Sequence, residues 1–151
     1  MRIEQIRDSG FGIRVSGFGF RDLGIIMKNY KELIVWQKGI ELAVEIYRII
    51  DLFPSKEKYA ISNQMQRAVI SISSNIAEGW GRGTTKEYIY FLRVARGSLL
   101  ELETQVIIAF KLKYIDQNNF DKVSDLIKSI AMMLNKLISK LKNKIGLRLM
   151  G

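Results

Sequence analysis

The chain contains no cysteine and no histidine, and these two absences exclude several kinds of chemistry. Without these residues there is no thiolate or imidazole zinc site, no Cys or Ser–His nucleophile, and no Glu-x-x-His motif of a di-iron bundle. The lack of cysteine also excludes disulfide bonds and is typical of a reducing compartment. A metal site made of carboxylates alone stays open, but no pattern indicates one, so we predict neither metal nor cofactor.

Proline and long apolar runs are scarce as well. The 151 residues include a single proline and no series of short β-type runs, which favours an all-helical fold. No apolar run approaches the roughly 20 residues that a membrane span needs. The N-terminus has no continuous apolar core of the kind that a secretory signal carries. We therefore expect a cytoplasmic protein that does not contact a membrane.

Positive charge, in contrast, is abundant. The sequence has 24 Lys and Arg residues against 15 Asp and Glu residues, a formal net charge of +9. This imbalance causes self-repulsion within one small domain. Solubility alone is one explanation, and a polyanionic partner, foremost a nucleic acid, is another. Since 48% of the residues are hydrophobic, a chain of this length can bury the core of a single domain.

Residues 1–27 differ in composition from the rest of the chain. Five of the 12 glycines lie here, and the unit Ser-Gly-Phe-Gly occurs twice, starting at Ser9 and at Ser16. We interpret the segment as a flexible leader. Because Met27 offers an alternative start, its place in the native protein stays open. The sequence predicts a helical domain over residues 28–146 and a tail over residues 147–151.

Apolar residues recur at three- and four-residue spacing over four segments, which predicts four helices. The expected ranges are about 31–52, from 56 or 58 to 78, from 84 to 113, and from 116 or 118 to 146. Asn29 is expected to cap the first helix, Thr84 with Glu87 forms a capping box for the third, and Asp116 or Asn118 is expected to cap the fourth. The fourth segment has strict heptad spacing at Val123, Ile127, Ile130, Leu134, Leu137, Leu141 and Ile145, up to Gly146.

Short connections between these helices favour an all-α fold, an antiparallel up-down-up-down four-helix bundle. The first helix carries two adjacent apolar stripes, which is a wider apolar face than a two-helix contact needs. One stripe contains Val35, Leu42, Ile46, Ile49 and Phe53, and the other contains Trp36, Ile40, Ala43, Tyr47 and Ile50. The surplus apolar surface predicts a homo-oligomer.

Residues 67–83 combine small polar side chains with helical spacing and end in a glycine-broken loop. Small groups allow helices to approach closely, so we interpret six residues as structural or interface residues: Arg67, Ser71, Ser74, Asn75, Glu78 and Gly79. Gly79 suits the left-handed position that ends a helix. No catalytic residue is predicted, because Ser71, Ser74 and Asn75 lack a histidine base. A hairpin about residue 82 predicts the ion pairs Arg67–Glu101 and Glu78–Lys86.

Two groups of cations are candidates for binding nucleic acid. The first comprises Arg82, Lys86, Arg93 and Arg96, and the second comprises Lys136, Lys140, Lys142 and Lys144. Guanidinium groups suit phosphate oxygens, and residues 126–151 contain no acid that could neutralise the second group. Ion pairing inside the bundle and a solvated charged face are the alternatives. Tyr90 is the best exposed candidate for stacking on a base.

Several strings in the chain resemble one protein family. They are Leu33–Trp36, Gln64–Ala68, Ser71–Gly79, Gly81–Arg82, Phe91–Ser98 and Glu101–Gln105. Over about residues 30–145 they are similar to bacterial four-helix-bundle proteins whose reading frames were noticed inside intervening sequences of large-subunit ribosomal RNA genes. The string Ser-Asn-Ile-Ala-Glu-Gly, followed by Ala-Arg-Gly-Ser, is specific to that family.

The resemblance implies a homopentamer. It also implies a link to accessory proteins of diversity-generating retroelements, which contact a reverse transcriptase and bind nucleic acid through basic surfaces. We therefore expect a non-enzymatic, homo-oligomeric bundle that binds RNA or DNA. The alternative is a protein-interaction scaffold, such as a partner of a reverse transcriptase.

Overall fold

The computed structural model describes residues 28–58 and 60–149, which form helices and no strand. The four α-helices are α1 (Ile34–Ile50), α2 (Ile61–Gly81), α3 (Thr85–Lys111) and α4 (Gln117–Leu149). Two 3-10 helices, η2 (Tyr30–Glu32) and η3 (Ser55–Glu57), precede α1 and α2. The prediction of an all-α fold with four helices is confirmed. The expected leader, residues 1–27, and residues 150–151 of the expected tail lie outside the described residues.

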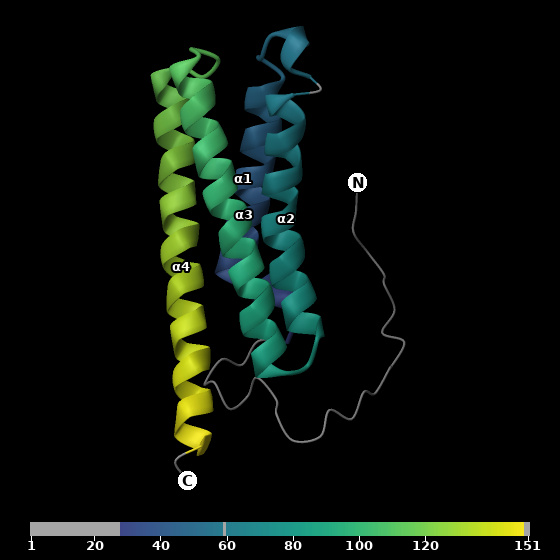
Figure 1. The fold of residues 1–151 in the computed structure, drawn as a ribbon, viewed down its shortest axis with the longest axis vertical. Helices are drawn as coiled ribbons and strands as arrows, with labels where there is room; N and C mark the ends of the chain where they lie inside the picture. The colour runs from purple at the N-terminus through teal and green to yellow at the C-terminus, as the bar shows by residue number, and fades with distance from the viewer. Residues whose placement is uncertain (1–27, 59, 150–151) are drawn as a thin grey trace.

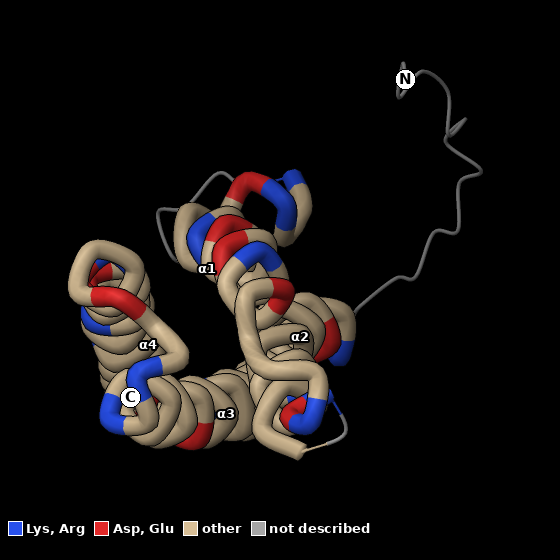
Figure 2. Tube along the Cα trace, turned by 90° about the horizontal axis from the view of Figure 1, so that it is seen from above, with Lys and Arg blue, Asp and Glu red and all other residues tan. Residues whose placement is uncertain are grey.

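The four helices lie side by side, with their long axes close to the vertical of Figure 1. Each helix contacts the next one in the chain, and α4 contacts α1. Seen from above, α1, α2, α3 and α4 follow one another around the molecule (Figure 2). α4 is the longest helix, and its C-terminal end extends beyond the ends of its neighbours (Figure 1).

Each helix contributes one apolar stripe to a common core. Fully buried members include Leu42 and Ile46 of α1, Met65 and Ile72 of α2, Leu92 and Leu102 of α3, and Ile130 and Leu134 of α4. The heptad positions of α4 are buried, except that Leu137 and Ile145 are half-buried. Of the two stripes predicted on α1, only the one containing Leu42 is fully buried. In the other stripe, Ile40 and Tyr47 are each 41% exposed.

The helix starts follow the predicted capping chemistry at two of three places. Thr84 Oγ1 accepts a hydrogen bond from the Glu87 amide at 3.2 Å, which begins α3 as expected. Asp116 accepts from the Asn119 amide at 2.8 Å at the start of α4. The expected cap of the first long helix was wrong. Asn29 caps the short η2, and Leu33 occupies the N-cap of α1 without a side-chain hydrogen bond.

The turn after α3 places a lysine in an unfavourable backbone conformation. The Lys113 and Tyr114 amides donate to Phe110 O and Ala109 O, each at 2.9 Å, which is the hydrogen-bond pattern of a Schellman motif. Lys113 occupies the left-handed position of this motif with φ of 60°. That position favours glycine, because a Cβ atom is strained there.

A polar contact ties α1 to α4 at the end of the bundle near this turn. Glu45 accepts from Lys122 Nζ at 2.7 Å and from Arg48 Nη2 at 2.8 Å. These hydrogen bonds, the one from Lys122 first, hold the pKa of Glu45 below its ordinary value. The contribution of these hydrogen bonds to the free energy of unfolding is therefore fully present above the unfolded-state pKa of the Glu45 carboxyl group. It is lost as the pH falls through the folded-state pKa.

The C-terminal part of α4 differs from the expectation in one respect. The helix continues through Gly146 to Leu149, whereas the apolar pattern ends at Ile145. A Cβ atom at Gly146 would meet no other atom within 4 Å, so the glycine is not required by packing. Gly146 therefore ends the heptad pattern without ending the helix.

Replacing Leu134 with Ala is expected to lower the free energy of unfolding by about 2–5 kcal/mol, because the fully buried side chain leaves a cavity. Met132→Ala is the matched control, since Met132 is 65% exposed on the same helix. Its effect should stay within about 0.5 kcal/mol. Urea denaturation followed by circular dichroism measures both values, and equal losses for the two variants would contradict the assigned core.

Replacing Lys113 with Gly is expected to raise the free energy of unfolding by up to about 1 kcal/mol, because glycine relieves the left-handed backbone strain. The same substitution at Lys111, the last residue of α3, should instead lower stability, since the residue there is helical. Chemical denaturation of both variants provides the measurement. A destabilised Lys113→Gly variant would mean that the turn is not held in the described conformation.

Candidate functional site

α2 approaches α1 closely at a pair of small residues. A Cβ atom built on Gly39 of α1 would overlap Ser73 Oγ of α2. Ser73 is buried, and its hydroxyl donates a hydrogen bond to Trp36 O at 3.5 Å. The two helices therefore approach closely where Gly39 lies opposite Ser73.

The contact between α2 and α3 contains a small polar network. Ser71 Oγ and Ser98 Oγ lie 2.9 Å apart, and Ser98 also donates to Val94 O at 3.2 Å. Asn75 Nδ2 donates to Ser71 O at 2.7 Å and to Ser71 Oγ at 2.9 Å. The structure thus places Ser71 and Asn75 at the junction of two helices within one chain, whereas Ser74 is exposed on the outer face of α2.

Gly79 plays a different role from the predicted one. It lies inside α2 and not in the left-handed position after the helix, which is taken by Gly83 with φ of 83°. A Cβ atom on Gly79 would lie 2.8 Å from Phe91 Cβ and 2.9 Å from Tyr88 Cδ2. The residue is glycine because α3 crosses α2 at this point, and the assignment as a helix terminator was wrong.

The predicted ion pairs between α2 and α3 are also wrong. Glu78 pairs with Arg82 of the following loop at 2.6 Å, and not with Lys86. Within residues 28–58 and 60–149, Arg67 forms no ion pair with Glu101, whose carboxylate accepts from Gln105 at 3.2 Å. Neighbours four residues apart on one helix are closer than residues on adjacent helices, and they bind these acids first.

The first group of predicted cations lies along α3 and the loop before it. Lys86 and Arg93 are exposed, and Arg96 is half-buried and donates to Asn135 Oδ1 of α4 at 3.1 Å. Arg82 lies over the Phe91 ring, with 5.0 Å between its Cζ and the ring centroid. Arg96 therefore holds α3 against α4, while Lys86 and Arg93 are available to a partner.

The second group, on α4, does not share one face. Lys136 and Lys140 flank an apolar groove of about 270 Å³ lined also by Leu33, Ile34, Val35, Met133 and Leu137. Lys142 lies seven residues after Asn135, so it shares the α4 face that Arg96 contacts. Lys144 is half-buried, and its ammonium nitrogen is shielded from solvent. Three of these four lysines are exposed, on two different faces of α4.

The aromatic residues near the start of α3 differ in exposure. Tyr88 is buried against the edge of Trp80, with 6.2 Å between ring centroids, and burial raises the pKa of its hydroxyl well above the ordinary value. Tyr90 is 61% exposed, and its ring contacts the edge of Phe91 at 5.2 Å between centroids. Of the aromatic residues Trp80, Tyr88, Tyr90 and Phe91, Tyr90 is the exposed one.

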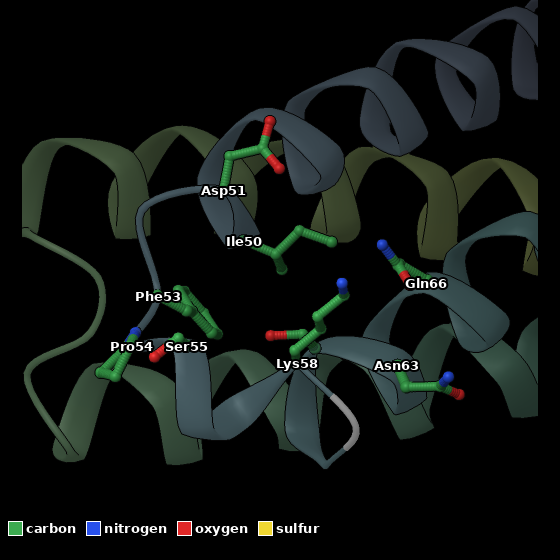
Figure 3. Close-up of a pocket in the computed structure, with 9 residues that line it drawn as sticks. Ile50, Asp51, Phe53, Pro54, Ser55, Lys58, Asn63 and Gln66 are labelled. Carbon is green, nitrogen blue, oxygen red and sulfur yellow. The ribbon is translucent and has the colours of Figure 1, made fainter.

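A hollow between the end of α1 and the start of α2 gave no signal in the sequence (Figure 3). Its volume is about 430 Å³, and its lining residues are Ile50, Asp51, Phe53, Pro54, Ser55, Lys58, Ser62, Asn63 and Gln66. The Lys58 side chain extends between Ile50 and Gln66, whereas the Asp51 carboxylate points away from it (Figure 3). The hollow forms where two helix ends meet around η3, which no helical periodicity reveals.

Neither a metal-ligand cluster nor a membrane-spanning helix is present in the described part of the chain. No three acidic side chains of residues 28–58 and 60–149 come together in a way that could hold a metal ion. Across the same residues, no helix is both long enough and apolar enough to span a bilayer.

Comparison with known proteins identifies relatives of this chain. A family model described as 23S rRNA-intervening sequence protein matches residues 31–136. A solved structure from Bacteroides thetaiotaomicron, a protein of unknown function from the S23 ribosomal protein family, is similar in fold, with a TM-score of 0.65 and 24% sequence identity. The similarity covers 70% of this chain and 98% of that one. No functionally curated protein matches the chain.

Replacing Gly79 with Ala is expected to lower the free energy of unfolding by about 1–3 kcal/mol, because the added methyl group overlaps Phe91 and Tyr88. Gly97→Ala is the matched control. A Cβ atom there meets nothing within 4 Å, so the variant should gain about 0.5–1 kcal/mol from helix propensity. Thermal and urea unfolding compare the two, and a stabilised Gly79→Ala variant would contradict the close approach of α2 and α3.

Proposed function

We propose that this chain, which belongs to the 23S rRNA-intervening sequence protein family, is a non-enzymatic bundle that binds RNA or DNA through exposed cations of α3 and α4. The supporting observation is the lack of neutralising acids around these cations. Lys86, Arg93, Lys136, Lys140 and Lys142 are exposed, and none forms an ion pair with another residue of the described ranges.

Four acids of the bundle have partners other than these cations. Glu45 binds Lys122 and Arg48, and Glu78 binds Arg82. Asp116 caps α4, and the Glu87 carboxylate accepts a hydrogen bond from the Thr84 hydroxyl at 2.6 Å. The five exposed cations named above therefore face solvent without an ion-pair partner in the described ranges, and a phosphate backbone would release counterions on binding there.

The proposal includes an antiparallel up-down-up-down arrangement and a homopentamer, which the family resemblance implies. Short connections favour the arrangement, since residues 82–84 alone join α2 to α3.

Association between copies is supported by apolar side chains on the outer surface of α1 and α2. Ile40, Val44 and Tyr47 form one exposed stripe on α1, and Ile70 of α2 is 49% exposed.

The outer face of α2 offers a second place for a neighbouring copy. A hollow of about 500 Å³ lies there, lined by Tyr30, Ser74, Ala77, Glu78, Gly81 and Arg82. Most of these α2 residues are small, so another helix can approach closely. Assembly would concentrate a net charge of +9 per chain, which a polyanion would stabilise.

A protein-interaction scaffold is the second candidate function, and the groove between α1 and α4 supports it. Its lining is mostly apolar, with Lys136 and Lys140 at the rim. An amphipathic acidic segment of a partner, such as a reverse transcriptase, would fit this combination of surface and charge. Both candidates use Lys136 and Lys140, but no residue of α3 lines this groove, so changes at Lys86 and Arg93 separate the two.

Wild-type affinity for RNA or DNA is expected to fall by about tenfold or more between roughly 50 and 200 mM salt, because bound cations displace counterions. The double variant Lys86→Glu/Arg93→Glu should lose most binding and reduce the slope of log affinity against log salt by about two. Filter binding measures both quantities.

Lys31→Glu/Lys56→Glu is the control, since it changes the net charge equally at exposed residues of the 3-10 helices. Circular dichroism checks that both variants fold. A flat salt dependence, or equal losses in the two variants, would contradict a nucleic-acid interface on α3.

A further inference from the structure

Tyr90 is a large aromatic residue that the bundle does not need for its core. Its neighbours Ile89 and Leu92 are buried, whereas Tyr90 is 61% exposed on the opposite side of α3. An aromatic face turned to solvent beside cations is typical of surfaces that bind unpaired bases.

The Tyr90 ring is supported by an edge-on ring contact, a cation–π contact and an ion pair that follow one another. Phe91 contacts it edge-on, with an interplanar angle of 85°. Arg82 covers the Phe91 ring at 5.0 Å, and Glu78 fixes Arg82 through a 2.6 Å ion pair. The orientation of Tyr90 is therefore supported by the loop and by α2, so little rotamer freedom is lost when a base stacks on it.

Two exposed cations flank Tyr90 on the same helical stripe. Lys86 precedes it by four residues and Arg93 follows it by three, so on an ideal helix all three lie within about 60° of one another. The nearby Glu87 is bound to the Thr84 hydroxyl at 2.6 Å. One turn further, Gly97 presents no side chain and has no atom within 4 Å of its Cβ position. The stripe therefore presents Lys86, the Tyr90 ring and Arg93 in that order, followed by an open surface at Gly97.

We propose that Tyr90 stacks on an unpaired base while Lys86 and Arg93 bind the phosphates on either side, so the preferred ligand is a single strand. This inference rests on the proposed nucleic-acid function and specifies its ligand. In a duplex the faces of the bases are covered by their neighbours, and Tyr90 has no base to reach. RNA and DNA single strands offer the same base face and phosphates.

The test compares oligoadenylate single strands, as RNA and as DNA, with the duplexes that they form with their complements. Tyr90→Leu should weaken binding of both single strands by roughly 5- to 150-fold and leave duplex binding within about twofold. Tyr90→Phe should bind as the wild type does, because the ring is kept. The salt slope of Tyr90→Leu should equal that of the wild type, since no cation is removed.

Leu52→Ala is the control, because Leu52 is a 67% exposed apolar residue after α1, outside the α3 stripe and outside the exposed α1 stripe. Wild-type affinity for Tyr90→Leu, or equal losses on single strands and duplexes, would overturn the stacking role. A changed sedimentation coefficient for Tyr90→Leu would also overturn it, because Tyr90 would then belong to a contact between copies.

If the wild type binds neither form at low salt, the proposed function itself fails, whereas duplex-only binding refutes the single-strand inference alone. A preference for the RNA strand over the DNA strand would indicate further contacts to the 2′-hydroxyl groups.

Discussion

The close approach of α2 to both of its neighbours determines what the outside of this protein presents. Gly39 against Ser73, and Gly79 against Tyr88 and Phe91, are contacts that leave no room for a methyl group. Because the second of these contacts sets how α3 packs on α2, the apolar stripe of α3 faces the core. The opposite stripe, with its cations and its exposed tyrosine, necessarily faces solvent.

The electrostatic character of the surface follows from where the acids are used. Asp116 caps the N-terminus of α4, the Glu87 carboxylate binds the Thr84 hydroxyl, and Glu45 links α1 to α4 through Lys122. A carboxylate in such a position gains more interaction free energy from its local partner than from a distant surface lysine. The bundle therefore stabilises itself with its acids and leaves cations on α3 and α4 toward solvent. A polyanion compensates such a surface better than solvent alone does.

The sequence predicted those features that depend on local pattern. The heptad residues of α4 and the Thr84 cap require only spacing and hydrogen-bonding chemistry within one helix, and both are present. The role of Gly79 could not be derived, because it depends on where α3 crosses α2. The division of the α4 lysines between two faces follows from their spacing along the helix, whereas the contact of one of these faces with Arg96 depends on how α3 packs on α4. The predicted partner of Glu78 was wrong, because Glu78 pairs with Arg82, four residues further along the chain, and not with Lys86 of α3.

Mapping the contacts of a bound strand is the most direct test of the central claim, that the outward stripe of α3 is a nucleic-acid surface. A single strand carrying photoreactive thiouridine can be crosslinked to the full chain, and the modified peptides can be identified by mass spectrometry. We expect the crosslinks to concentrate on residues 86–97, with Tyr90 foremost. Crosslinks confined to α1, or to the hollow between α1 and α2, would contradict the claim.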